Sequence, residues 1–154
     1  METMEWKLCR LLIDCLKNES KFDATRLSSL LPERWQEFMA LAKTQRVMPL
    51  LWHRLRQKGL EQDVPMAVAG ALREASRRNI LHNLCYYGEL RLLLSALKPE
   101  GIPLILLKGI FLADAVYGDI GLREMNDIDV LVRPADLTRI AEVLTGMGYS
   151  YRQL

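Results

Sequence analysis

The sequence has few of the residues that build metal-thiolate sites and disulfide frameworks. Its 154 residues include three cysteines and two histidines, and these form no CxxC, HExxH or other metal-ligand spacing. Zinc sites and a disulfide framework are therefore not supported, and the few free thiols fit a reducing compartment. We expect a cytoplasmic protein.

Long hydrophobic runs are also missing. The N-terminus METMEWKLCR carries charges where a signal peptide needs an apolar core, and the run IPLILL before Lys108 is far shorter than a membrane span. We therefore predict a chain that is neither exported nor inserted in a membrane.

The charge is nearly balanced, with a net value of +2, but its distribution is uneven. Residues 1–98 contain 16 basic and 11 acidic side chains, whereas residues 99–154 contain 5 and 8. The basic residues of the first part are scattered along predicted helices and accompany acids, which favours solvated helix faces over nucleic-acid binding. Nucleic acid is therefore the less favoured kind of partner.

Residues 1–98 have the apolar periodicity of helices. Pro32 opens one helix, and Gly59 ends another that starts near Met48. From Pro65 to Leu97 apolar residues recur at spacings of three and four with no internal proline, which predicts one long helix that can bend at Gly88. We expect residues 1–98 to form a helical region.

The pattern changes after Pro99 and Gly101, which end the long helix. Five elements are predicted beyond them: a strand at 102–107, a helix at 110–117, a strand at 127–132, a helix at 134–145, and a short strand beginning near Tyr149. This β-α-β-α-β order predicts an α+β fold. The helical region would pack against a small mixed sheet formed by residues 99–154.

Asp127 and Asp129 are the strongest candidates for a chemical role. On a strand, two acids separated by one residue point to the same face, about 7 Å apart along the backbone. Such carboxylates can converge on divalent ions, and Mg²⁺ prefers oxygen ligands shared with a triphosphate, the arrangement of metal-assisted nucleotidyl transfer. The alternative interpretation is a solvated acidic pair at a strand end.

The position of the acids relative to the strand narrows the choice of chemistry. In haloacid-dehalogenase-like phosphatases and many sugar-nucleotide glycosyltransferases an apolar strand precedes the acidic pair. Here Arg123-Glu-Met-Asn precedes the pair and the apolar run follows it. This order argues against both of those classes.

Two further elements can contact phosphate. Lys108-Gly109 stands between a predicted strand and helix, where glycine permits a close backbone approach and free N–H groups attract anions. An ordinary strand–helix loop is the alternative. Arg123 lies four residues before Asp127 and can reach a phosphate oxygen, although a salt bridge to Asp119 or Glu124 would explain it equally well.

Several motifs occur together between residues 104 and 149. They are the apolar strand ending in Lys108-Gly109, the loop Tyr117-x-Asp119-x-Gly121-x-Arg123, the pair Asp127-x-Asp129 with its following strand, and the closing Gly148-Tyr149. With these motifs the segment closely resembles the uncharacterised bacterial nucleotidyltransferase-like family of the DNA polymerase β superfamily. The helical part before it resembles that family more loosely.

This resemblance implies a function for the chain. It implies that Asp127 and Asp129 bind metal and act as the catalytic acids, and that Lys108-Gly109 occupies the turn where relatives hold the triphosphate with Gly-Ser or Gly-Gly. Mg²⁺ or Mn²⁺ would be the cofactor. The expected reaction transfers a nucleoside monophosphate, with ATP as the favoured donor, to a hydroxyl-type acceptor on a small molecule, a protein or an RNA.

The resemblance also exposes a gap, because members of the superfamily usually need a third acid on a later strand. Residues 150–154 contain no candidate. We therefore expect a core truncated after residue 154 that binds nucleotide weakly and transfers it poorly or not at all. A non-catalytic nucleotide sensor and a helical protein-interaction module formed by residues 1–98 stay open as alternatives.

Overall fold

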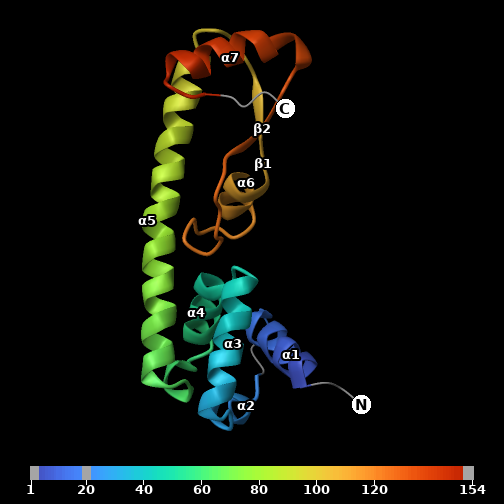
Figure 1. Ribbon diagram of the computed structural model, residues 1–154, viewed down its shortest axis with the longest axis vertical. Coiled ribbons are helices and arrows are strands. Elements are labelled where there is room, and N and C mark those ends of the chain that lie inside the picture. The colour runs from blue at the N-terminus through green and yellow to red at the C-terminus, as the bar shows by residue number, and fades with distance from the viewer. Residues whose placement is uncertain (1–3, 19–21, 151–154) are drawn as a thin grey trace.

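The computed structural model describes residues 4–18 and 22–150. Within these ranges the chain is a mostly helical α+β protein with seven α-helices, two short 3-10 helices and one two-stranded sheet. Figure 1 shows helices gathered at one end, the sheet at the other, and the helix α5 (Met66–Leu97) running along the side that joins them.

Four helices form the N-terminal end, and sequence punctuation sets several of their limits. They are α1 (Met4–Leu16), α2 (Thr25–Ser28), α3 (Pro32–Thr44) and α4 (Met48–Gln57), followed by the 3-10 helix η1 (Glu61–Asp63). Pro32 occupies the first turn of α3, where its missing N–H leaves no hydrogen bond unmade. Gly59 follows α4 with a φ of +68°, a conformation that glycine adopts without steric strain.

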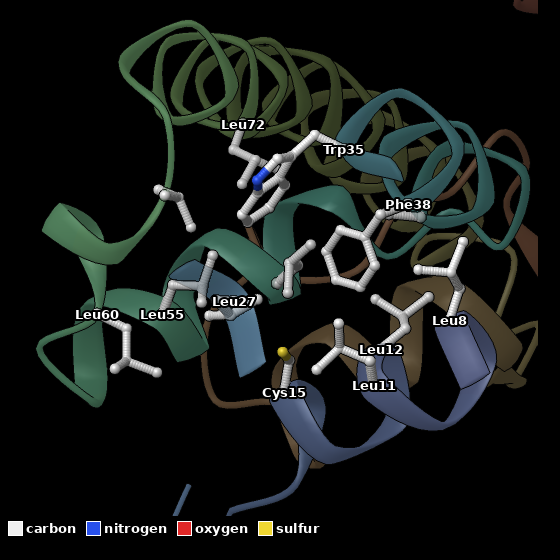
Figure 2. Packing of buried hydrophobic residues seen from close by; sticks show 13 residues of the cluster. Leu8, Leu11, Leu12, Cys15, Leu27, Trp35, Phe38, Leu55, Leu60 and Leu72 are labelled. Atoms are coloured by element: carbon white, nitrogen blue, oxygen red, sulfur yellow. The ribbon is translucent and has the colours of Figure 1, made fainter. Parts of the chain in front are cut away.

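The largest apolar cluster lies among these four helices and the start of α5. Phe38 and Leu51 are completely buried in it, and Trp35 contacts the Phe38 ring edge to face, with 5.7 Å between ring centroids. Figure 2 shows the side chains of α1 directed toward Phe38, with Leu72 of α5 on the opposite side. Burying each such side chain contributes about 1.5–3 kcal/mol, so this cluster holds the helical end together.

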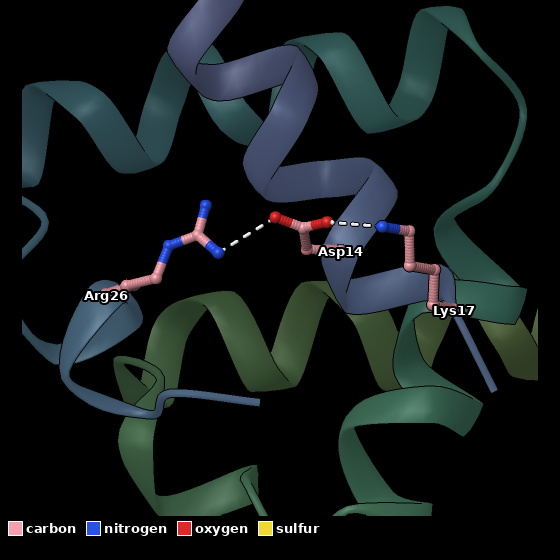
Figure 3. A network of polar contacts seen from close by, with 3 residues as sticks. All are labelled: Asp14, Lys17 and Arg26. Carbon is pink, nitrogen blue, oxygen red and sulfur yellow. Dashed lines mark hydrogen bonds and ion pairs between the residues drawn. The ribbon is translucent and has the colours of Figure 1, made fainter. Parts of the chain in front are cut away.

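A small polar network ties α1 to α2 at the surface (Figure 3). Asp14 accepts hydrogen bonds from Nη1 of Arg26 at 2.8 Å and from Nζ of Lys17 at 3.0 Å. These two cations, Arg26 first, hold the pKa of Asp14 below its usual value. Because the three side chains remain partly exposed to water, the network fixes the orientation of α2 more than it adds stability.

Helix α5 continues through Gly88 without interruption and takes part in both ends of the molecule. Leu72 belongs to the N-terminal apolar cluster, whereas Leu90, Leu93 and Leu97 pack near the sheet. Although α5 has 32 residues, neither it nor any other helix in the described part of the chain is long and apolar enough to cross a membrane.

The C-terminal end contains the sheet and two further helices. In chain order it consists of β1 (Leu104–Leu107), α6 (Lys108–Ala115), β2 (Asp129–Val132), the 3-10 helix η2 (Pro134–Asp136) and α7 (Leu137–Gly146). The strands are antiparallel, with Leu104 opposite Val132 and Leu107 opposite Asp129. Leu97, Ile102 and Ile140 pack against one part of the sheet, and Leu90, Ile110 and Met125 against the other.

The prediction of a mixed sheet with a third strand is wrong for the residues that the structure describes. Helix α6 has eight residues, and the chain after it turns back through the loop 116–128, so β2 returns alongside β1 in the opposite direction. Tyr149 and Ser150 belong to no strand, and the remaining residues of the predicted third strand lie outside the described ranges. The strands and helices otherwise follow the predicted order as far as α7.

Candidate functional site

The two candidate acids lie at the entrance to β2, but only one belongs to the strand. Asp129 is its first residue and is half-buried, with 25% of its side chain exposed. Asp127 precedes the strand and is exposed, so the predicted strand start at residue 127 is two residues too early. The pair therefore combines one acid fixed by the sheet with one on the approaching loop.

Lys108 is brought to Asp129 by the register of the sheet. Leu107 pairs with Asp129, and Lys108 follows it as the first residue of α6. Its Nζ donates a hydrogen bond to Oδ1 of Asp129 at 2.8 Å, and this bond raises the pKa of Lys108. The φ of Lys108 is +48°, which is uncommon for a residue with a side chain and often marks a functional turn.

The second oxygen of the Asp129 carboxylate has an unusual environment. Oδ2 is buried and has no hydrogen-bond partner among the described residues. A buried carboxylate oxygen without a partner is costly, and in native structures such an atom calls for an explanation, such as a catalytic role, a water or a bound ion. Asp129 thus has one oxygen neutralised by Lys108 and one still available.

Gly109 is buried between the start of α6 and the segment before β2. A Cβ atom at this position would lie 2.9 Å from the Cβ of Met125 and 3.9 Å from Nε of Arg123. The contact with Met125 is closer than real Cβ atoms accept, so packing alone requires glycine here. The resulting close approach places the Lys108 turn beside Arg123.

Arg123 is half-buried, and its Nε atom has no hydrogen-bond partner within the described ranges. The ion pair with Asp119 or Glu124 that the sequence allowed is not found among these residues. Asp119 instead accepts a hydrogen bond from the backbone N–H of Gly121 at 2.7 Å. The structure therefore brings Lys108, Gly109, Arg123 and Asp129 into one neighbourhood, next to the exposed Asp127.

Two asparagines of α5 that belong to none of the sequence motifs fix the loop that carries Arg123. Asn79 donates to the carbonyl oxygen of Gly121 at 2.7 Å, and Asn83 donates to those of Ile120 and Arg123, the latter at 2.8 Å. Both asparagines are buried. The sequence signal was a polar pair spaced by four residues within a long helix, which places both on one face.

The same face of α5 also reaches α6. Tyr87, four residues beyond Asn83, donates from its hydroxyl to the carbonyl oxygen of Ile110 at 3.0 Å. Burial raises the pKa of this hydroxyl, with a smaller contribution from the charge of Asp114. Helix α5 thus supports both the Arg123 loop and the helix that begins at Lys108.

The helical end contacts the site through Arg46, which follows α3 with a φ of +54°. In the amide orientation that satisfies both neighbours, Asn126 accepts a hydrogen bond from Nη1 of Arg46 at 3.0 Å and donates to the carbonyl of Met125 at 3.0 Å. Burial raises the pKa of Glu124, an effect that the positive charge of Arg46 partly offsets. The sequence offered no signal for this contact, since it joins residues far apart in the chain.

A comparison with protein families identifies the family of this chain. The model of a family described as uncharacterised nucleotidyltransferase matches residues 32–153. The chain belongs to this family. The matched region begins at the start of α3 and extends beyond α7. It therefore covers much of the helical end as well as the candidate site. Comparisons with curated proteins and with solved structures gave no match.

Proposed function

We propose that this nucleotidyltransferase family member binds a nucleoside triphosphate, with ATP favoured, together with Mg²⁺ or Mn²⁺ at Asp127 and Asp129, and transfers the nucleoside monophosphate to a hydroxyl-type acceptor. The observation that carries the proposal is the buried Oδ2 of Asp129 beside the Lys108 turn, an oxygen that has no hydrogen-bond partner in the described part of the chain. It supplies a preorganised anionic oxygen next to a cation that can contact phosphate.

The donor set fits a hard divalent cation only if phosphate completes the coordination. Within the described ranges no group of three or more His, Cys, Asp or Glu side chains is arranged to hold a metal ion. Two carboxylates suffice for Mg²⁺, which takes its remaining ligands from phosphate oxygens and water. When bound, the ion would neutralise charge on the triphosphate and on the leaving pyrophosphate.

The other residues would hold the triphosphate in place. Lys108 is 68% exposed on its side chain, so its ammonium group can turn from Asp129 toward a phosphate oxygen. Nε of Arg123 lies beside Gly109 without a hydrogen-bond partner among residues 4–18 and 22–150, and the planar guanidinium suits a bidentate contact with phosphate. These cations would orient the α-phosphorus for attack by the acceptor hydroxyl.

A non-catalytic nucleotide-binding role is the second candidate. It is favoured by the same absence of a third ligating acid near Asp127 and Asp129 in the described residues. Both candidates require metal-dependent nucleotide binding at this pair. Only the first requires release of pyrophosphate when an acceptor is supplied.

Calorimetric titration of ATP with and without Mg²⁺ tests the binding that both candidates share. We expect Mg²⁺-dependent binding to the wild-type chain and its loss in the Asp127→Asn, Asp129→Asn double variant. Asp114→Asn is a matched control, because it removes an exposed acid of α6 outside the pair. Unchanged ATP binding by the folded double variant would refute the proposed site.

A further inference from the structure

A groove separate from the acidic pair lies between α4, α5 and the loop that precedes Arg123. Its volume is 980 Å³, at the upper end of the range of about 300–1,000 Å³ typical of small-molecule sites. Neither of the two candidate acids nor Lys108 lines it. Gly121 and Leu122 form one wall, and Asn79 holds the carbonyl oxygen of Gly121 against α5, so this wall is fixed in place.

The α5 wall of the groove presents two arginines. Arg73 and Arg77 are one helical turn apart, both line the groove, and neither forms an ion pair with any residue in the described ranges. Their neighbour Arg78 lies outside the lining and pairs with Glu74 at 3.5 Å. Two unpaired guanidinium groups on adjacent turns suit a phosphate-like oxyanion, which each can bind through two N–H groups.

The opposite wall is different in chemistry. Trp52 and His53 of α4 contribute half-buried aromatic side chains to this wall, while Ile80 on the α5 wall and Leu122 on the loop wall add apolar surface. The remaining arginine, Arg56, is paired with Glu61 at 3.5 Å. Aromatic and apolar surface facing a pair of cations suits a molecule with a planar ring at one end and an oxyanion at the other.

We propose that this groove binds a small phosphorylated molecule with a planar ring, the phosphate at Arg73 and Arg77 and the ring toward Trp52. The loop that walls the groove at Gly121 and Leu122 continues directly into Arg123, so the groove and the candidate active site share this loop. We assign the ligand of this groove the role of acceptor in the transfer reaction. This role rests on the proposed nucleotidyl transfer, whereas the binding of the ligand to the groove does not.

The test uses AMP and inorganic phosphate as probes in the presence of EDTA, where the carboxylates of the acidic pair repel a phosphate. Binding is followed by calorimetry. We expect AMP to bind without metal and inorganic phosphate to bind more weakly, because it lacks a ring. The Arg73→Ala, Arg77→Ala variant should lose about tenfold or more in AMP affinity, since each charged contact contributes severalfold.

The controls separate this site from the acidic pair. Arg78→Ala removes a neighbouring charge that does not line the groove, and its AMP affinity should stay within about twofold of wild type. The Asp127→Asn, Asp129→Asn variant should bind AMP normally in EDTA even where it no longer binds Mg²⁺ and ATP. Absence of metal-free binding by AMP, or binding that survives loss of Arg73 and Arg77, would overturn the proposal.

A competition experiment tests the acceptor role. If the groove holds the acceptor, saturation with AMP in the presence of Mg²⁺ should leave ATP able to bind, because the two ligands occupy different sites. Mutually exclusive binding that depends on Arg73 and Arg77 would overturn the acceptor role. Failure of the transferase proposal would be seen in a different experiment, the ATP titration, as binding that is unchanged in the Asp127→Asn, Asp129→Asn variant.

Discussion

Nζ of Lys108 lies 2.8 Å from Oδ1 of Asp129, while Oδ2 of the same carboxylate is buried without a partner among the described residues. Lys108, in the turn after β1, therefore neutralises one of the two carboxylate oxygens of Asp129, the first residue of β2. Under the proposed function, Lys108 and a divalent cation would share the Asp129 carboxylate, the lysine at Oδ1 and the cation at Oδ2. On binding of nucleotide the lysine would exchange this carboxylate for a phosphate oxygen.

Replacing Lys108 by methionine should therefore have opposite effects on two ligands. Binding of Mn²⁺ alone should strengthen, because the competing ammonium group is gone and the site is more negative. Binding of ATP in the presence of Mg²⁺ should weaken by about three- to tenfold, because a phosphate contact is lost. Mn²⁺ paramagnetic titration and calorimetry measure the two effects, and Lys108→Arg, which keeps the charge, is the control. Parallel changes in both affinities would contradict this account.

Gly109→Ala should destabilise the protein by about 1–3 kcal/mol, because its Cβ would lie 2.9 Å from the Cβ of Met125 and force α6 away from the loop. Gly88→Ala is the matched control, since a Cβ there meets nothing within 4 Å in the middle of α5. That change should stabilise the protein by about 0.5–1 kcal/mol. Urea unfolding measures both, and equal effects of the two substitutions would show that the contact with Met125 is unimportant.

Asn83→Ala should loosen the loop that carries Arg123. The carbonyl oxygens of Ile120 and Arg123 would lose a buried donor, at a cost of about 1–3 kcal/mol. Hydrogen exchange should accelerate in residues 118–126, and ATP binding in the presence of Mg²⁺ should weaken in parallel. Ser95→Ala on the exposed side of α5 should change neither quantity. If residues 118–126 of Asn83→Ala were as protected from hydrogen exchange as in the wild type, the Asn83 hydrogen bonds would not hold the loop in place.

The stability of the protein should depend on pH through the ionisation of Glu124. Because burial raises its pKa above the ordinary value of 4.5, the folded chain holds this proton more tightly than the unfolded chain. The stability contributed by the protonated Glu124 carboxyl is fully present below the pKa of this group in the unfolded chain. It is lost as the pH rises through the pKa of the group in the folded chain. Glu124→Gln should therefore be more stable than wild type at pH 7, and the difference should shrink as the pH falls toward 4.5. Urea midpoints across this range are the measurement, and a difference independent of pH would contradict the prediction.

The sequence by itself determined the local secondary structure and which residues are candidates for the site. Apolar periodicity marks the helices, and the prolines and glycines at positions such as Pro32 and Gly59 limit them, because these signals act through the backbone of neighbouring residues. The motifs between residues 104 and 149 sufficed to indicate the nucleotidyltransferase family, which the match over residues 32–153 confirms. The roles of Asp127, Asp129, Lys108, Gly109 and Arg123 in binding stay predictions.

Only the tertiary structure decided how these residues meet. The direction of β2 depends on how the loop 116–128 folds back, and periodicity carries no information about that path, so the mixed sheet was wrongly predicted. The pairing of Leu107 with Asp129 then selects Lys108 as the partner of that acid. The clamps from Asn83 and Arg46 join residues distant in the chain, and such contacts arise from packing that no local pattern encodes.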